Sequence, residues 1–233
     1  MSQMDRVEIE GVPMDICYAM PEGSGPFPAM VVMFHRGGFD DFTKKILDDL
    51  ADAGYASAAP DLYHWPPVAD VPSENPFPRD PEITKDVAGT LEWRGKKPEI
   101  NMDKVGIIGH CMGGRMAFFG GSVNPAFKAT VAYYSGNMFV PWSDDGPAPF
   151  DLLKDLECPV IGFFGNDDRN PSPEDVDKID AELTRLGVEH TFHRYDGAGH
   201  AFQNFLGPER YREAATKDSW PKGVAFLDRT LKG

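Results

Sequence analysis

A cysteine flanked by glycines is the side chain of this 233-residue chain best placed to act as a nucleophile. Residues 106–114 read "GIIGHCMGG", so Cys111 has Gly109 and Gly113 two positions away on either side. An apolar run precedes the motif and a helix-like run follows it, as in a nucleophile elbow. A Cβ at either flanking position would collide with a neighbouring strand or helix. The pattern predicts a thiol above the carboxyl edge of a sheet, where helix N-terminal amides favour the thiolate.

A base for this thiol is offered near the other end of the chain. "RYDGAGHAFQN" follows a strand-like segment and places His200 on a glycine-rich loop. The strand-like segment before it ends in "GFFGNDDRNPSP", which offers Asp167 and Asp168. Taken singly, such an aspartate is usually a turn residue and such a histidine is usually structural. Their order along the chain is that of a nucleophile–acid–histidine triad, and we predict Cys111, Asp167 and His200, choosing Asp167 because it follows the strand by two residues.

An oxyanion hole would complete this machinery. One donor is expected to be the backbone N–H of Met112, the residue after the nucleophile. The other is expected from the loop "HRGGF", residues 35–39, where glycines let the backbone approach a substrate. We favour the N–H of Arg36, with that of Gly37 as the second choice. The alternative interpretation of this loop is a simple Gly-Gly turn.

The elements that must position these residues alternate along the chain. The two-residue period of apolar side chains in 7–18 predicts a hairpin at the start of the chain. Near its end, Pro221 is expected to interrupt or kink the last helix. Apolar runs predict strands at 27–35, 55–63, 104–109, 127–135, 158–165 and 189–196. Helical patterns cover 42–53, 83–94, 111–121, 173–187 and 211–231. The fold class is therefore α/β, a mostly parallel central sheet with helices on both faces, in one domain over 1–233.

Two irregular stretches could form the walls of a site. The proline-rich residues 64–82 are interpreted as a possible cap loop, with a stiff surface loop as the alternative. Residues 136–150 could supply the other wall. Aromatic side chains expected to line the pocket are Phe39, Tyr63 and Phe202, with Trp65 and Trp142 in the wall loops.

Composition excludes some partners. Lys and Arg number 23 against 37 Asp and Glu, a formal charge of −14, which argues against nucleic acid and anionic membranes. The first residues lack the pattern of a signal peptide, and no run approaches the length of a transmembrane helix. Three cysteines without CxxC spacing suggest neither a disulfide framework nor a zinc site. We expect a cytoplasmic protein with free thiols.

Four segments, read together, resemble the dienelactone hydrolase family of the α/β-hydrolase fold. They are "PDLY" (60–63), "KVGIIGHCMGG" (104–114), "GNDDRNPSP" (165–173) and "YDGAGHAF" (195–202). The resemblance spans nearly the whole chain. The cysteine at the elbow distinguishes this family from plain esterases of the same fold, which carry serine there. The resemblance implies the triad Cys111–His200–Asp167. It also implies hydrolysis of a small ester or enol-lactone through a thioester, with no metal or organic cofactor.

The chain departs from the family pattern at two places. The family carries a glutamate after the third strand that contacts the resting cysteine, where this chain reads "FHRGGF". Activation is then expected from His200, with His35 or Arg36 as further groups that could favour the thiolate. Family members also grip a substrate carboxylate with an arginine four residues after the catalytic histidine, where this chain has Asn204. Arg79 or Arg36 are the cationic candidates here.

The expected substrate-binding set combines these considerations. Its members are His35, Gly37, Phe39, Tyr63, Arg79, Trp142, Phe202 and Asn204. Competing hypotheses are a non-catalytic ligand-binding protein on the same scaffold, a thioesterase or general carboxylesterase, and a redox role for Cys111. A monomer or a homodimer is expected.

Overall fold

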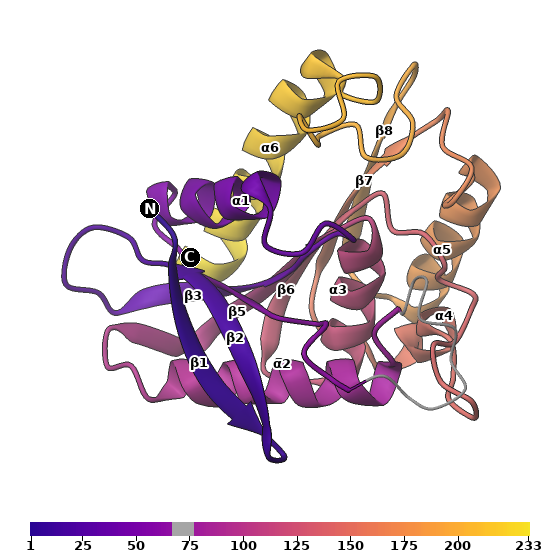
Figure 1. Ribbon diagram of the computed structural model, residues 1–233. Coiled ribbons are helices and arrows are strands. Elements are labelled where there is room, and N and C mark those ends of the chain that lie inside the picture. Colours follow the sequence, from indigo (N-terminus) through magenta and orange to yellow (C-terminus); the bar gives the residue numbers. More distant parts are fainter. Residues whose placement is uncertain (67–76) are drawn as a thin grey trace.

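Eight strands form one sheet at the centre of the protein (Figure 1). The structure is a computed structural model and describes residues 1–66 and 77–233. The sheet order is β1-β2-β4-β3-β5-β6-β7-β8; β1 and β2 pair antiparallel, β2 pairs antiparallel with β4, and the remaining neighbours are parallel. The strands are β1 (Gln3–Ile9), β2 (Val12–Ala19), β3 (Phe27–Met33), β4 (Ala56–Pro60), β5 (Ile100–His110), β6 (Phe127–Tyr133), β7 (Val160–Gly165) and β8 (His190–Tyr195). The predicted fold class is confirmed.

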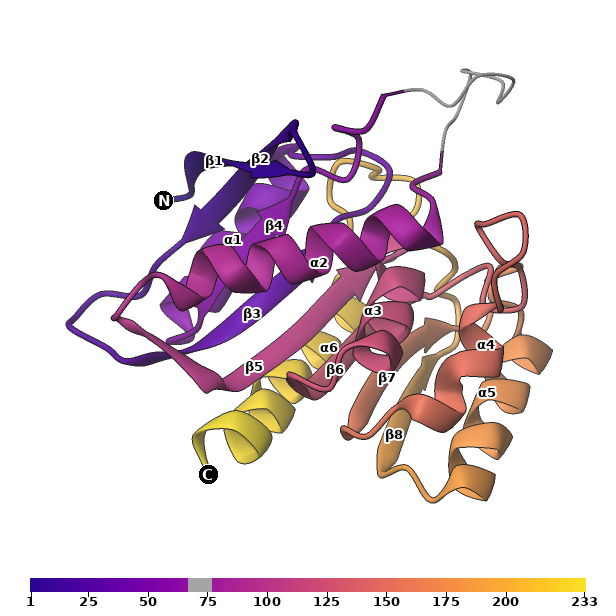
Figure 2. The same ribbon diagram turned by 90° about the horizontal axis from the view of Figure 1, so that it is seen from below.

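Helices cover both faces of this sheet (Figure 2). Buried side chains of α2, α3 and α5 pack in a core on one face, and those of α1 and α6 pack on the other. Among the described residues, no helix is both long enough and apolar enough to cross a bilayer. The helices are α1 (Asp41–Asp52), α2 (Asp80–Gly95), α3 (Met112–Val123), α4 (Pro149–Leu152), α5 (Pro173–Leu186) and α6 (Glu213–Leu227).

Several boundaries differ from the expected ones. Helix α2 begins at Asp80, earlier than predicted, because Pro81 suits a first helical turn and the Glu82 side chain accepts a hydrogen bond from the Arg79 N–H at 3.2 Å. The last helix is not interrupted at Pro221, which lies inside α6. Most of the predicted cap loop, residues 67–76, lies outside the described part of the chain.

The turn between β5 and α3 is the predicted elbow. Cys111 has φ 59° and ψ −119°, a strained conformation for a residue with a side chain. A Cβ on Gly109 would lie 1.9 Å from the Gly113 carbonyl oxygen, and one on Gly113 would lie 1.9 Å from the Met33 oxygen. The Cys111 N–H donates to the Tyr133 carbonyl at 3.0 Å. Helix α3 can therefore press against the end of β3 only because these positions carry no side chain.

Gly113→Ala tests this close approach. We expect the substitution to lower the free energy of unfolding by about 3 kcal/mol, because rotating a side chain cannot relieve a clash between Cβ and backbone. The measurement is urea-induced unfolding followed by circular dichroism. Gly95→Ala is the control, because a Cβ at Gly95 meets nothing within 4 Å and its stability should be unchanged or slightly higher. Equal midpoints for the two variants would contradict the packing argument.

Candidate active site

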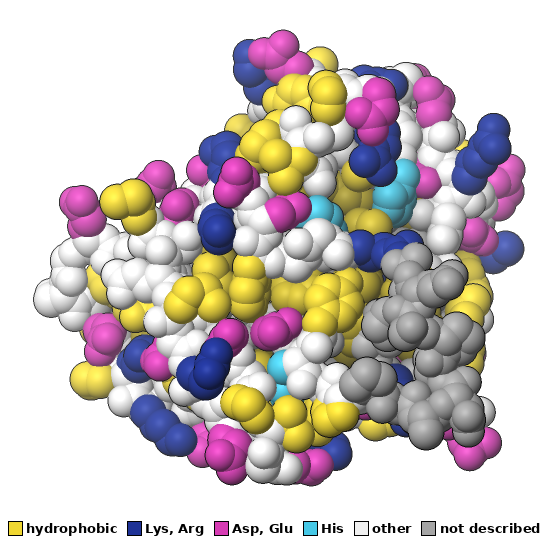
Figure 3. Space-filling model, viewed as in Figure 1, with side chains coloured by type: hydrophobic (Ala, Val, Ile, Leu, Met, Phe, Trp, Pro, Cys, Tyr) yellow, Lys and Arg dark blue, Asp and Glu magenta, His cyan; other side chains and the backbone are white. Residues whose placement is uncertain are grey.

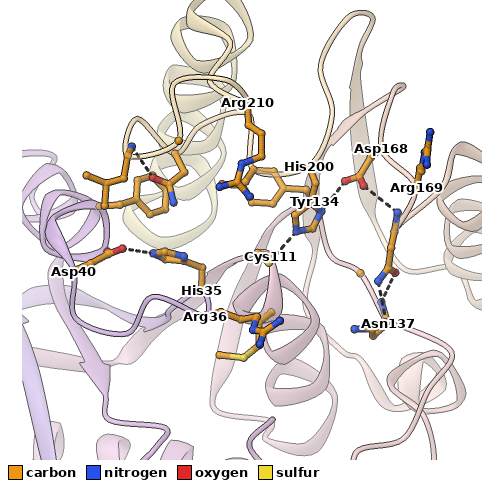
Figure 4. Close-up of a pocket in the computed structure, with 18 of the residues that line it drawn as sticks. His35, Arg36, Asp40, Cys111, Tyr134, Asn137, Asp168, Arg169, His200 and Arg210 are labelled. Carbon is orange, nitrogen blue, oxygen red and sulfur yellow. Dashed lines mark hydrogen bonds and ion pairs between the residues drawn. The ribbon is translucent and has the colours of Figure 1, made fainter. Parts of the chain in front are cut away.

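Three loops at the carboxyl edge of the sheet bring a thiol, an imidazole and a carboxylate into contact (Figure 4). His200 Nε2 lies 2.8 Å from Cys111 Sγ, and its Nδ1 lies 2.8 Å from Asp168 Oδ2. Cys111 comes from the elbow after β5, Asp168 from the loop after β7 and His200 from the loop after β8. Because these strands are parallel, their ends meet at one edge although the residues are far apart in sequence.

The carboxylate in contact with His200 belongs to Asp168, and the choice of Asp167 was wrong. Backbone pairing with the β8 side continues past the end of β7, since the Asp167 N–H donates to the Ala198 carbonyl at 2.9 Å. The Asp167 side chain consequently faces solvent, whereas Asp168 is buried. Asp168 also accepts the Asn170 N–H on its other oxygen at 2.9 Å. This Asx turn before Pro171 helps to hold the Asp168 carboxylate in place.

The charge state of His200 is set by its two partners. Burial alone would lower the pKa of His200, because it penalises the charged ring. The hydrogen bonds to Asp168 and Cys111 outweigh burial, and the pKa of His200 is raised above its ordinary value. The two partners of His200 therefore favour the protonated form of its ring.

The two residues predicted to supply the oxyanion hole, Met112 and Arg36, both line the pocket beside Cys111. Neither backbone N–H has an acceptor among the described residues. The Gly37 N–H, the second choice on the same loop, donates to His35 Nδ1 at 3.3 Å and is therefore less available than the Arg36 N–H.

His35 is fixed by a neighbour on the same loop. Its Nε2 lies 2.8 Å from Asp40 Oδ2, while the other Asp40 oxygen caps α1 by accepting the Thr43 N–H at 2.9 Å. Burial raises the pKa of Asp40, but His35 and Thr43 outweigh it and the pKa lies below its ordinary value. Both ring nitrogens of His35 thus face its own loop. His35 lines the pocket without a hydrogen bond to Cys111.

The triad opens into a pocket of about 660 Å³. In the space-filling view, basic and histidine side chains gather at a hollow floored by hydrophobic side chains (Figure 3). Three arginines contribute to the lining, namely Arg36, Arg169 and Arg210. They make the pocket locally basic in a chain whose formal charge is −14. Of these three, the sequence analysis had singled out only Arg36.

The expected substrate-binding set is only partly brought together. His35 and Asn204 line the pocket. The members that do not line it are Gly37, Phe39, Tyr63, Arg79, Trp142 and Phe202.

Each of these six residues contacts a neighbouring residue instead of the cavity. Phe202 is fully buried and packs edge-on against Tyr134 with ring centroids 5.2 Å apart. The Tyr63 hydroxyl donates to the Arg36 carbonyl at 3.4 Å. Arg79 pairs with Asp144 at 3.0 Å. Phe39 packs edge-on against Phe34, and the Arg115 guanidinium lies over the Trp142 ring. The Gly37 N–H donates to the His35 ring.

Sequence reasoning also missed Tyr134. This residue follows β6, has φ 38° and lines the pocket, with its ring edge-on to His200 at 5.3 Å between centroids. Its hydroxyl is buried and has no partner among the described residues, and burial raises its pKa well above the ordinary value. The Tyr134 N–H donates to the Phe163 carbonyl at 2.8 Å, which holds the residue in this conformation. No pattern in the sequence "AYYSG" predicts that hydrogen bond.

The fold and the elbow, with its acid and histidine, define an α/β-hydrolase. The chain belongs to the dienelactone hydrolase family, whose model matches residues 14–231. Members of this family hydrolyse carboxylic esters and lactones, and the chain is an enzyme of that class.

Individual relatives agree with this placement. A "Putative carboxymethylenebutenolidase" of Methylorubrum extorquens is 30% identical over 216 residues, 88% of this chain and 72% of that protein. One of Salmonella typhimurium is 30% identical over 229 residues, 94% and 83% respectively. The crystal structure titled "Putative Dienelactone Hydrolase" from Klebsiella pneumoniae has a TM-score of 0.84 at 24% identity, covering 98% of this chain and 99% of that one. That structural likeness shows the shared fold.

Two adjacent aspartates provide a matched pair of variants. Asp168→Asn removes the charge that holds the proton on His200, so the pKa of His200 falls, the ring no longer promotes ionisation of the thiol, and the thiolate needed for alkylation forms only at higher pH. We expect alkylation of Cys111 by iodoacetamide at pH 7 to slow on the order of tenfold, with the rate profile displaced to higher pH. Asp167→Asn should leave the profile unchanged. A larger effect from Asp167→Asn would restore the original choice.

Proposed function

We propose that this enzyme hydrolyses small esters or enol-lactones through a thioester on Cys111. The observation that carries the proposal is the contact of 2.8 Å between Cys111 Sγ and His200 Nε2, with Asp168 on the opposite ring nitrogen. This is the geometry in which an activated nucleophile and its base operate. The family membership supports the reaction class.

In the first step, the Cys111 thiolate attacks the carbonyl carbon and a carbon–sulfur bond forms. The oxyanion receives hydrogen bonds from the N–H groups of Met112 and Arg36. The carbon–oxygen bond to the leaving group then breaks, and His200 gives its proton to the leaving oxygen. The products of this step are the thioester, the protonated leaving group and a neutral His200. The leaving group of an ester departs as a separate alcohol, whereas the enol of a lactone stays attached to the acyl chain.

In the second step, water attacks the thioester carbon while His200 Nε2 takes one of its protons. The carbon–sulfur bond breaks, the carboxylic acid leaves, and the thiolate–imidazolium pair is restored. Asp168 stabilises the imidazolium in both halves of the cycle. A thiolate expels an enolate or phenolate far more readily than an amide nitrogen, so activated esters and enol-lactones suit this site best.

The pocket arginines support an anionic substrate. Arg36 lies over the Phe77 ring at 5.2 Å, and Arg210 is half exposed beside Glu209. Neither arginine is buried, so each can turn toward a ligand. Arg79, an earlier candidate for this role, is held by Asp144 and does not line the pocket.

Trapping of the acyl group on sulfur tests the proposed reaction. A panel of activated esters, enol-lactones, a thioester and an amide is mixed with the enzyme and quenched in acid. Mass spectrometry should find the acyl group on Cys111 and not on Cys17 or Cys158, which are buried and whose pKa values burial raises.

Cys111→Ala should lose activity on these esters by on the order of a thousandfold or more. Preferred turnover of the thioester would favour the thioesterase alternative. An unreactive Cys111 and no turnover would favour a ligand-binding protein. Unchanged turnover in Cys111→Ala would refute the mechanism.

Arg210→Gln tests the preference for anions. We expect KM for a carboxylate-bearing ester to rise about three- to tenfold, a discounted value because the exposed side chain is screened by solvent. KM for a neutral ester of the same alcohol should be unchanged. Arg229→Gln is the control, because Arg229 pairs with Glu189 and is not a pocket residue. Equal effects on both esters would contradict a charge-specific role.

A further inference from the structure

A buried polar pair lies directly beneath the triad and is not used by the chemistry. His110 precedes the nucleophile, is 2% exposed, and its Nε2 lies 2.8 Å from Gln203 Oε1. Gln203 follows His200 by three residues and is also buried. The pair therefore joins the strand that carries the thiol to the loop that carries the base.

The surroundings make this hydrogen bond expensive to break. The His110 ring stacks on Tyr133 with centroids 4.6 Å apart and meets the edge of Phe42 at 5.2 Å. Burial lowers the pKa of His110 to about 3, so the ring is neutral at working pH. Since the oxygen of Gln203 can only accept, Nε2 carries the proton and donates it. Separating the pair would leave buried polar groups without partners.

The loop that carries His200 makes few other hydrogen bonds to the elbow. Residues 196–212 form no helix or strand until α6 begins at Glu213. Backbone bonds fix parts of this loop, among them the Arg212 N–H donating to the Phe202 carbonyl at 2.8 Å. Between this loop and the elbow residues 109–113, the described hydrogen bonds are two, His200 to Cys111 and His110 to Gln203. The hydrogen bond between His200 and Cys111 is lost whenever the sulfur reacts.

We propose that His110 and Gln203 are positioning residues whose hydrogen bond holds His200 within contact distance of Cys111. The pair keeps that distance in the resting enzyme. It also keeps it while the sulfur carries an acyl group and cannot hold His200. This second part rests on the proposed function. A displacement of catalytic groups on the order of 1 Å can lower the reaction rate a hundredfold. A hydrogen bond that does not involve the reacting atoms therefore helps to maintain the rate.

The test uses His110→Phe, Gln203→Leu and the double variant of the full chain. The readout is the rate of Cys111 alkylation by iodoacetamide between pH 5 and 9, which needs no turnover. Each single variant should slow alkylation at pH 7 by about tenfold and displace the half-maximal rate to higher pH. The double variant should be no worse than the poorer single one, since the two residues act through one bond.

Tyr55→Phe is the matched control for lost stability. It removes a hydrogen bond of 2.7 Å to Asp228, a partner outside both the elbow and the His200 loop. It should lower the melting temperature while leaving alkylation unchanged. If His110→Phe and Gln203→Leu behave in the same way, or if their effects on alkylation add, the positioning role is overturned.

A second measurement addresses the acylated state. In single turnovers of an activated ester, Gln203→Leu should slow release of the acyl group more than its formation, so the acyl-enzyme accumulates. Equal slowing of both steps would remove the second part of the proposal. A displaced alkylation profile in an enzyme that hydrolyses none of the esters would keep the positioning role and reject the proposed function.

Discussion

The position of the thiol depends on a backbone contact that leaves no room for a side chain. Gly113 brings the first turn of α3 against the carbonyl of Met33, and this contact holds Cys111 at φ 59°. The strain is sustained because β3, β5 and β6 are hydrogen-bonded neighbours whose ends cannot move independently. The same contact sets where α3 begins, with Met112 directly after the cysteine. The position of Cys111 and the start of α3 therefore share one structural cause.

The elbow and the fold could be predicted because their causes are local. Apolar runs determine the buried strands, and glycine spacing around Cys111 reflects a steric need that any chain with this turn would share. Asp168 could not be separated from Asp167 in this way. A one-residue shift reverses the direction of a side chain, and here the direction depends on pairing between Asp167 and Ala198, far along the chain. The pocket arginines lie on irregular loops, whose paths no periodicity records.

The two carboxylates that line the pocket are each compensated by a histidine. The carboxylates of Asp40 and Asp168 line the same cavity and would repel an anionic sulfur if they were uncompensated. Each instead faces a histidine at 2.8 Å, His35 and His200 respectively. Only His200 faces the sulfur as well.

One loop carries three of the polar side chains that line the pocket. His200, Asn204 and Arg210 all line the pocket and all come from residues 196–212. The hydrogen bond from His110 reaches this loop at Gln203, which lies between His200 and Arg210 in the sequence. Any displacement of the loop would move His200 and Arg210 together. The positions of these two side chains are therefore coupled through the backbone, and a buried hydrogen bond that fixes one of them restrains the other as well.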